Sequence, residues 1–218
     1  MPADPFEDPF AWAEAHGIAL SRAQQEKLAL FVRELLAWQH KMNLVGVSSE
    51  DRLIRELLLD SLVPLPAIGQ KGRLLDLGSG GGIPAIPLKI CRPHLHFQLL
   101  EPSHKKAVFL RHAVRMLGLE RIEVLCARIE DSGDKLASDG YQVITSRAVT
   151  SLPRILQWGG RWLANDGILV TFQGSSWKDV LEESKDGMRQ EKLVLSRTIP
   201  YRLPGMTGER TVLIFSHS

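Results

Sequence analysis

The sequence predicts an α/β fold in which a mostly parallel sheet ends in an antiparallel hairpin and follows a helical N-terminal segment. Apolar runs alternate with segments of helical periodicity from Arg73 onward. A glycine-rich turn follows the first run directly, and a Pro/Gly loop too short for a helical crossover joins the last two runs, 193–199 and 211–215. We therefore expect seven strands, with a helical extension over residues 1–70 and a sheet domain over residues 71–218.

Within the N-terminal extension, two helices are predicted. Ser21 and Gln24 form a capping box, and apolar side chains then recur at helical spacing up to about Met42. Residues 48–51 open a second helix, which should end where the proline-containing segment begins at Pro64.

The sheet domain begins with the first of five strands that we expect to be parallel. These strands are residues 73–77, 96–101, 121–126, 141–145 and 167–172. The helix after the first strand should be short, because Pro84 and Pro87 are tolerated only in a first turn. Further helices are expected at 103–117, 151–163 and 177–188.

The glycine-rich turn has the form D-x-G-x-G-x-G, built from Asp76, Gly78, Gly80 and Gly82. Glycine allows a sharp turn and close approach of a ligand to the backbone. The carboxyl edge of a parallel sheet is where nucleotide-type ligands bind. Glu101, at the end of the next strand, lies 23 positions beyond Gly78 and suits the hydroxyls of a ribose. These features predict a cofactor that contains a nucleoside.

The kind of cofactor follows from the details of the turn. The dinucleotide fingerprint read from Gly78 fails at Ile83. Read from Gly80 it fits, but it then lies too far from the strand and places Pro84, which has no N–H, at the helix start. No P-loop lysine follows. A carboxylate at Asp76 suits S-adenosylmethionine (AdoMet), which carries two cationic groups and no phosphate.

Composition excludes several other classes of protein. A hydrophobic fraction of 44% supports a core, and a formal charge of +2 excludes a histone-like polycation. Cys91 and Cys126 fit no metal spacing, so we expect no metal and two small buried apolar residues. Without an apolar run of membrane-spanning length or a signal peptide, we expect no membrane contact and a cytoplasmic protein. We also expect a monomer.

Longer motifs resemble the bacterial glucose-inhibited division protein B family, the 16S rRNA guanine-N7 methyltransferases. The resemblance covers nearly the whole chain and rests on residues 38–44, 60–62, 76–84, 105–110, 128–130, 146–148 and 208–210. It implies a class I, Rossmann-like methyltransferase fold, AdoMet as cofactor, and 16S rRNA within the small ribosomal subunit as partner. The chain departs from the family pattern at Leu57, Ala85 and Gln173.

The resemblance also implies particular contacts with the cofactor. They fall at Gly78, Ile83, Glu101, Pro102, Ser103, Ile129, Glu130 and Arg147. Together with Asp76, Gly80 and Gly82 from the glycine turn, these are the predicted cofactor-binding residues.

The strand that ends near Thr145 carries no catalytic base or nucleophile. Amino-methylating enzymes have an Asp/Asn-Pro-Pro-aromatic motif there, whereas this chain has Ser146-Arg147-Ala148. Methylation at carbon-5 of a pyrimidine needs a cysteine, and neither cysteine is suitably placed. Guanine N7 has an in-plane lone pair and needs only alignment. Arg147 is the predicted catalytic residue, positioning the substrate and the AdoMet end; the alternative is a structural ion pair with Asp76 or Glu130.

The helix at 103–117 carries a basic face that would contact RNA phosphates. Its predicted RNA-binding residues are Lys105, Lys106, Arg111 and Arg115. The alternative is an ordinary solvated face. Two other functions stay open at this point: a methyltransferase of a small molecule, and a non-catalytic RNA- or ribosome-binding protein on the same scaffold. An NAD dehydrogenase fits less well.

Overall fold

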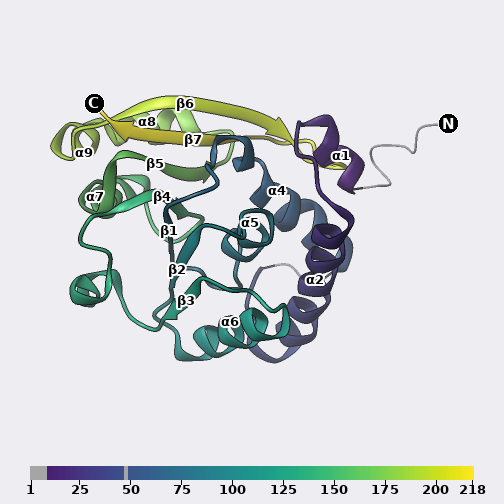
Figure 1. Ribbon diagram of the computed structural model, residues 1–218. Coiled ribbons are helices and arrows are strands. Elements are labelled where there is room, and N and C mark those ends of the chain that lie inside the picture. The colour runs from purple at the N-terminus through teal and green to yellow at the C-terminus, as the bar shows by residue number, and fades with distance from the viewer. Residues whose placement is uncertain (1–8, 47–48) are drawn as a thin grey trace.

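The computed structural model describes residues 9–46 and 49–218, and within them a seven-stranded sheet lies between two layers of helices (Figure 1). The strands are β1 Arg73–Leu77, β2 His96–Leu100, β3 Ile122–Leu125, β4 Tyr141–Ser146, β5 Leu163–Gln173, β6 Leu193–Arg202 and β7 Glu209–His217. Their order is β3-β2-β1-β4-β5-β7-β6. β1 to β5 are parallel, and β7 is antiparallel to both β5 and β6. The predicted sheet is therefore confirmed.

The helices agree with the sequence at most positions. They are α1 Pro9–Ala15, α2 Arg22–Met42, α3 Glu50–Leu53, α4 Leu59–Leu62, α5 Ala85–Cys91, α6 His104–Met116, α7 Leu152–Trp162, α8 Trp177–Glu183 and α9 Lys185–Gln190. Three 3-10 turns are η2 Leu65–Ala67, η3 Ile129–Asp131 and η4 Gly133–Lys135. The single helix expected at 177–188 is wrong, because Ser184 separates α8 from α9 and its hydroxyl donates to the Val180 carbonyl at 2.6 Å.

Local signals in the N-terminal segment act as the sequence predicts. The Ser21 side chain accepts from the Gln24 N–H while the Gln24 side chain accepts from the Ser21 N–H, so the capping box is formed. Ser49 caps α3, and residue 48 lies outside the described part of the chain. A π-helical segment, η1 Ile54–Leu58, lies between α3 and α4 and was not predicted. π-Helical turns often occur at functional sites.

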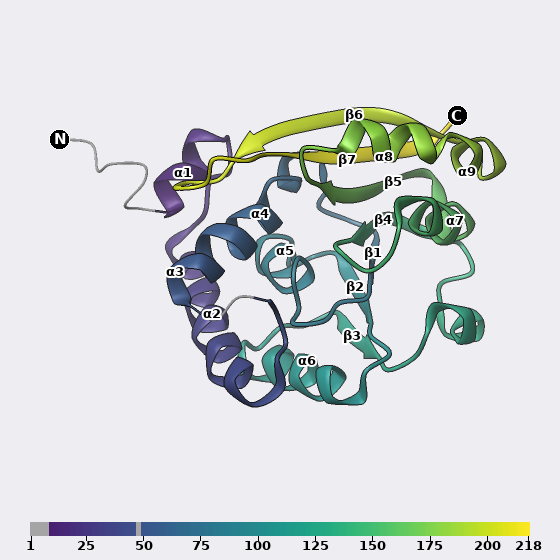
Figure 2. The same ribbon diagram turned by 180° about the vertical axis from the view of Figure 1, so that it is seen from behind.

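Two hydrophobic clusters lie on opposite faces of the sheet (Figures 1 and 2). One cluster joins α2, α4, α5 and α6 to the sheet and includes Phe31, Leu59 and Phe109. The other lies under α7, α8 and α9 and includes Tyr141 and Phe215. The N-terminal helices share this first cluster with the sheet. Packing in the cluster therefore fixes these helices relative to the ends of the strands. The division at residue 70 stays a prediction.

The two cysteines differ in exposure. Cys91 is buried, as expected, whereas Cys126 is exposed, so the expectation of two buried cysteines is wrong for Cys126. Cys126 follows β3 at its carboxyl end, where the chain leaves the sheet. Across residues 9–46 and 49–218, no helix is both long and apolar enough to cross a bilayer.

Candidate functional site

The glycine turn after β1 requires glycine for steric reasons. Gly78, Gly80 and Gly82 have φ values of +68°, +54° and +81°, a region that other residues adopt at a cost. A Cβ on Gly78 would lie 2.6 Å from the Val149 side chain. At Gly78 the turn therefore lies directly against the loop after β4, with no room for a side chain.

Four backbone N–H groups of this turn are used within the protein. The N–H groups of Gly78 and Ser79 donate to the Leu100 carbonyl at 2.8 and 3.0 Å. Gly80 donates to Glu101 Oε2 at 2.8 Å, and Gly82 donates to the Ser79 carbonyl at 2.7 Å. A phosphate-binding loop needs such donors to be free. The turn therefore suits a nucleoside ligand without a phosphate.

Glu101, at the carboxyl end of β2, fixes the turn from one side. The residue is only 5% exposed, and its two carboxylate oxygens accept from the N–H groups of Gly80 and Ser103. Ser103 is the residue that precedes α6. Each carboxylate oxygen has a further lone pair. Glu101 can therefore hold the turn and α6 in register and still accept from a hydroxyl of a ligand.

Asp76, the fourth residue of β1, is a buried carboxylate with unused bonding capacity. The Thr145 hydroxyl donates to its Oδ1 at 2.6 Å, but its Oδ2 has no hydrogen-bond partner among the described residues. Burial raises the pKa of Asp76 to about 6, against the opposing effect of the Thr145 hydrogen bond. The Ser146 hydroxyl nearby in the sheet is also buried and without a partner there. Buried polar atoms of this kind usually have a partner, so they indicate a ligand.

A pocket of about 510 Å³ opens at the carboxyl ends of β1 to β4. Among the predicted cofactor-binding residues, those that line it are Gly78, Pro102, Ile129 and Glu130. Leu100, Val149 and Trp158 add apolar walls of the kind that hold a purine ring. Asp76 and Glu101 adjoin lining residues in the chain. The other predicted contacts, Gly80, Gly82, Ile83, Ser103 and Arg147, lie outside this lining.

A second pocket, of about 580 Å³, lies at the opposite edge of the sheet. It is lined by Arg73, His96 and Asp139 among others, from the amino ends of the first strands. Ligands of open parallel sheets bind beyond the carboxyl ends of the strands. The pocket beside Gly78 is therefore the candidate site.

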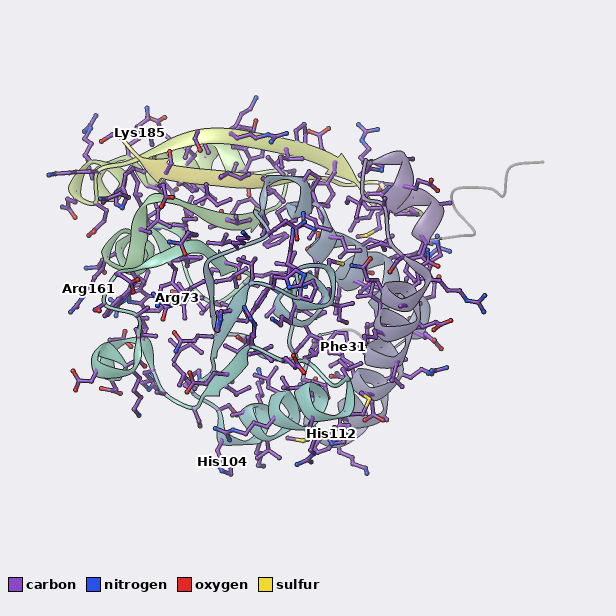
Figure 3. All side chains as sticks on the ribbon, in the orientation of Figure 1. Phe31, Arg73, His104, His112, Arg161 and Lys185 are labelled. Carbon is purple, nitrogen blue, oxygen red and sulfur yellow. The ribbon has the colours of Figure 1, made fainter. Side chains whose placement is uncertain are left out.

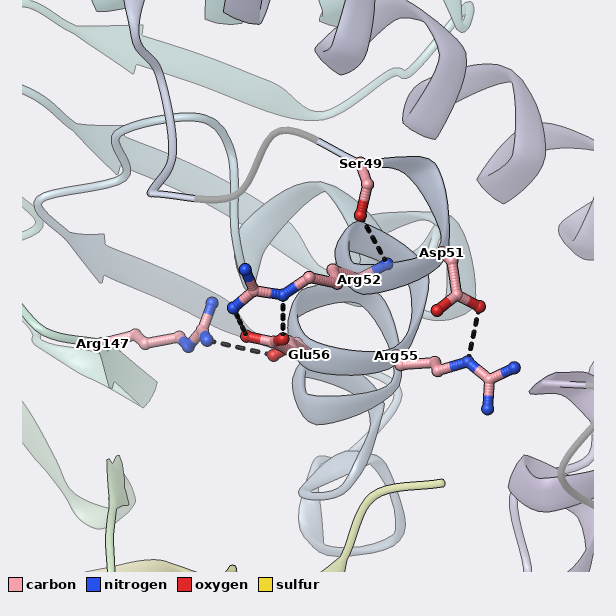
Figure 4. A network of polar contacts seen from close by, with 6 residues as sticks. All are labelled: Ser49, Asp51, Arg52, Arg55, Glu56 and Arg147. Atoms are coloured by element: carbon pink, nitrogen blue, oxygen red, sulfur yellow. Dashed lines mark hydrogen bonds and ion pairs between the residues drawn. The ribbon is translucent and has the colours of Figure 1, made fainter. Parts of the chain in front are cut away.

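Arg147 turns toward the helical extension. Its Nε lies 2.9 Å from Asp60 Oδ2. Its Nη2 donates to the Glu56 carbonyl at 3.2 Å, the contact drawn in Figure 4. The expected alternative partners, Asp76 and Glu130, are wrong. Asp76 is bound by Thr145, and Glu130 pairs with Arg154 at 2.9 Å.

Asp60 stands out in the sequence only as part of the motif at 60–62, whereas in the structure it is the centre of a buried polar cluster. It is 1% exposed and receives hydrogen bonds on Oδ1 from the Tyr201 hydroxyl at 2.6 Å and from Arg210 Nη1 at 3.1 Å. Arg147 Nε lies close to Asp60 Oδ2, but this oxygen receives no hydrogen bond from the described residues. The contact is therefore an ion pair in which the Nε–H of Arg147 does not point at the oxygen. The motifs at 60–62, 146–148 and 208–210 are far apart in the chain, and nothing in their composition shows that they meet.

The basic face of α6 begins directly after Ser103, one of the predicted cofactor contacts. Lys105, Arg111 and Arg115 are exposed and Lys106 is half-buried. Figure 3 shows His104 at the outer edge of the molecule and His112 on the same helix. His112 pairs with Glu34 of α2 at 2.9 Å, so that side of α6 is packed rather than available to a partner.

This strand order, with a glycine turn after β1 and an acid after β2, defines a class I methyltransferase fold. Solved structures agree. A ribosomal protein L11 methylase from Lactobacillus delbrueckii subsp. bulgaricus is 13% identical, with a TM-score of 0.59 over 80% of this chain and 81% of that one. M. jannaschii TYW2 in complex with AdoMet is 14% identical, with a TM-score of 0.55 over 69% and 71%. At such identities these likenesses concern the fold alone.

Sequence comparisons show which methyltransferase family the chain belongs to. Residues 24–204 match the family described as rRNA small subunit methyltransferase G. Proteins called ribosomal RNA small subunit methyltransferase G from Desulfotalea psychrophila and Marinobacter nauticus are 34% and 36% identical to this chain. These alignments cover 92% and 94% of this chain and 93% and 91% of the relatives. The chain belongs to this methyltransferase family, as the resemblance predicted.

Proposed function

We propose that the protein transfers a methyl group from AdoMet to N7 of a guanine in 16S rRNA of the small ribosomal subunit. One observation carries the choice of cofactor. Four N–H groups of the glycine turn are engaged internally, and the turn lies beside a buried Asp76 with an unpartnered oxygen. Such a site favours a cationic nucleoside over a phosphate-bearing one. Family membership supports the reaction and the RNA.

The residues present fit AdoMet. Leu100, Ile129 and Val149 provide apolar walls for an adenine ring, and Glu101 has spare lone pairs for ribose hydroxyls. Asp76 supplies negative charge for a cationic group. When bound, AdoMet supplies a methyl group on a sulfonium that is already a good leaving group. The protein then has to orient the acceptor and exclude water.

The acceptor atom follows from what the site lacks and from the family. The chain has Ser146, Arg147 and Ala148 where β4 ends, and none of the three is a general base. Guanine N7 carries an in-plane lone pair, so no proton has to leave before transfer. In this proposal Arg147 positions the substrate, holding the base edge or a flanking phosphate with the N–H groups that Asp60 and Glu56 leave unused.

We expect the protein to prefer the RNA of the assembled small subunit over free RNA. A formal charge of +2 provides little non-specific grip, so the shape of the subunit must contribute to binding. The basic face of α6 contacts phosphates beside the cofactor site. We also propose that the protein acts as a monomer in the cytoplasm.

The experiment that tests this function measures transfer of labelled methyl from AdoMet to small subunits that lack the modification. Gly78→Ala should abolish transfer, because its Cβ would meet Val149. Gly133→Ala is the matched control, since a Cβ there meets nothing within 4 Å. AdoMet binding without transfer to RNA would favour a small-molecule methyltransferase. Absence of both would favour a non-catalytic RNA-binding scaffold.

A further inference from the structure

Three distant parts of the chain meet at the Asp60 carboxylate. Asp60 belongs to α4, Arg147 follows β4, and Tyr201 and Arg210 belong to β6 and β7. Two guanidinium groups thus share one carboxylate that is 1% exposed, while their own side chains are 17% and 26% exposed. Since a guanidinium stays charged at any ordinary pH, the cluster carries an excess positive charge held by a single anion.

The fourth member of the cluster is a fixed donor. Burial raises the pKa of the Tyr201 hydroxyl above its ordinary value, and the Asp60 charge reinforces this effect. Tyr201 therefore stays protonated and donates to Asp60 Oδ1. The carboxylate is thus oriented from the hairpin side, with Oδ2 facing Arg147.

The loop that follows β4 connects this cluster to the cofactor pocket. Ala148 has a φ of +51°, which turns the chain immediately after Arg147. The Val149 side chain then lies against Gly78, and Val149, Thr150 and Ser151 line the pocket. Arg147 pairs with Asp60 of α4 and donates to the Glu56 carbonyl of the π-helical segment, the second contact being shown in Figure 4. The two contacts hold the start of this loop against these two segments.

We propose that Asp60 is a positioning residue of the methyl-transfer site, which acts through Arg147 to hold the 147–151 loop in place over the glycine turn. The role of Asp60 in transfer rests on the proposed function, whereas its effect on the loop does not. Without the carboxylate, Arg147 would keep only the Glu56 carbonyl and would face the charge of Arg210 at close range. The loop, which forms one wall of the pocket, would then be held less firmly at Arg147.

The test is a double-mutant cycle of Asp60→Asn and Arg147→Ala. Hydrogen exchange of residues 147–151 is measured without AdoMet, and AdoMet affinity is measured by calorimetry. In the wild-type background, Asp60→Asn should speed exchange in the loop and weaken AdoMet binding by about tenfold. In the Arg147→Ala background, Asp60→Asn should change neither the exchange rate nor the affinity, because the ion pair that links Asp60 to the loop is already absent. KM for AdoMet should rise more than kcat falls.

Asp139→Asn is the matched control, because Asp139 pairs with Arg73 at the opposite edge of the sheet. It should leave the loop and the affinity unchanged. Should Asp60→Asn not fold, Tyr201→Phe removes one hydrogen bond to the same carboxylate, keeps all charges, and should have a smaller effect of the same sign.

Equal effects of Asp60→Asn with and without Arg147, or faster exchange over the whole protein and not in the loop, would overturn the proposal. Failure of the proposed function would look different. Wild-type protein would then show no transfer to RNA, while the exchange rates of the loop would still report whether Asp60 acts through Arg147.

Discussion

At the scale of single residues, Asp76 shows how burial sets the charge of a site. The pKa of its carboxyl is about 6 in the folded protein, against an ordinary value of 3.8. The folded state therefore binds this proton more tightly than the unfolded chain does. The stability that the protonated form contributes is present at low pH and is lost as the pH rises through about 6.

Asp76→Asn should remove this dependence, because the amide stays neutral. The quantity to compare is the unfolding free energy of the variant minus that of the wild type. This difference should be more favourable to the variant by about 1 kcal/mol at about pH 7.5 than at about pH 5. Urea unfolding of the AdoMet-free protein at the two pH values measures this difference. The same difference in unfolding free energy at both values would show that Asp76 is already ionised at the lower one.

Glu101 should bind AdoMet less well when its charge is removed. In Glu101→Gln, the amide NH₂ would face one of the two backbone N–H groups that the carboxylate now accepts. We expect AdoMet affinity, measured by calorimetry, to fall by about 10- to 100-fold. Glu183→Gln on α8 is the control, since its side chain is exposed on the opposite helical layer. An unchanged affinity for Glu101→Gln would remove Glu101 from the site.

Sequence reasoning identified the residues of the glycine turn, because left-handed φ values and tight approach leave a glycine pattern. It could not show that Asp60 lies between Arg147 and Arg210. A buried ion pair is made by residues whose types are common on any surface, and only the fold shows that Asp60, Arg147 and Arg210 converge.

At the scale of elements, short α5 depends on a lysine at its end. Lys89 is 1% exposed, and its Nζ donates to the carbonyls of Pro93, Leu95 and Arg121. It thus provides a hydrogen-bond donor for two carbonyls in the turn between α5 and β2 and for one carbonyl just before β3. Burial lowers the pKa of Lys89 to about 8, which is consistent with an enclosed ammonium.

Lys89→Met should destabilise the protein, because the methionine fills the space and leaves these carbonyls without a donor. We expect a loss of about 1–3 kcal/mol in unfolding free energy. Lys27→Met, on the exposed face of α2, should change it by less than about 0.5 kcal/mol. If the two variants unfold at the same urea concentration, the lysine has no role in this turn.

The elements themselves were largely predictable. β1 was placed at its observed bounds, because an apolar run is bounded by Gly72 and Gly78. The π-helical turn at 54–58 leaves no comparable mark, since its sequence IRELL reads as ordinary amphipathic helix. The break at Ser184 was missed for the same reason, because it depends on one side-chain hydrogen bond to the backbone.

At the scale of the whole molecule, the candidate cofactor pocket and the basic face of α6 are neighbours, because Pro102 lines the pocket and α6 begins two residues later. Replacing Lys105 and Arg115 with Gln should weaken RNA binding by a similar factor for all sequences. The slope of log K against log salt should fall by about 1.5 in magnitude, as two phosphate contacts are lost. Lys178 and Lys185, replaced together on the other helical layer, should leave the slope unchanged. Equal slopes for both double variants would place the RNA elsewhere.

The topology was predictable as a whole because loop lengths decide it. Long crossover connections, three with an α-helix and one with two 3-10 turns, make β1 to β5 parallel. The short loop after β6 makes the last pair antiparallel. The arrangement of the N-terminal helices was not predictable, since their apolar faces match any partner. That arrangement brings Asp60 to the end of β4.

The central claim, methyl transfer to guanine N7, is tested most directly by nucleoside analysis. Small subunits from a strain without this protein would be incubated with it and labelled AdoMet, and their 16S rRNA then digested and analysed by mass spectrometry. We predict a single labelled product, 7-methylguanosine. A label on any other nucleoside, or no label from protein that binds AdoMet, would contradict the account.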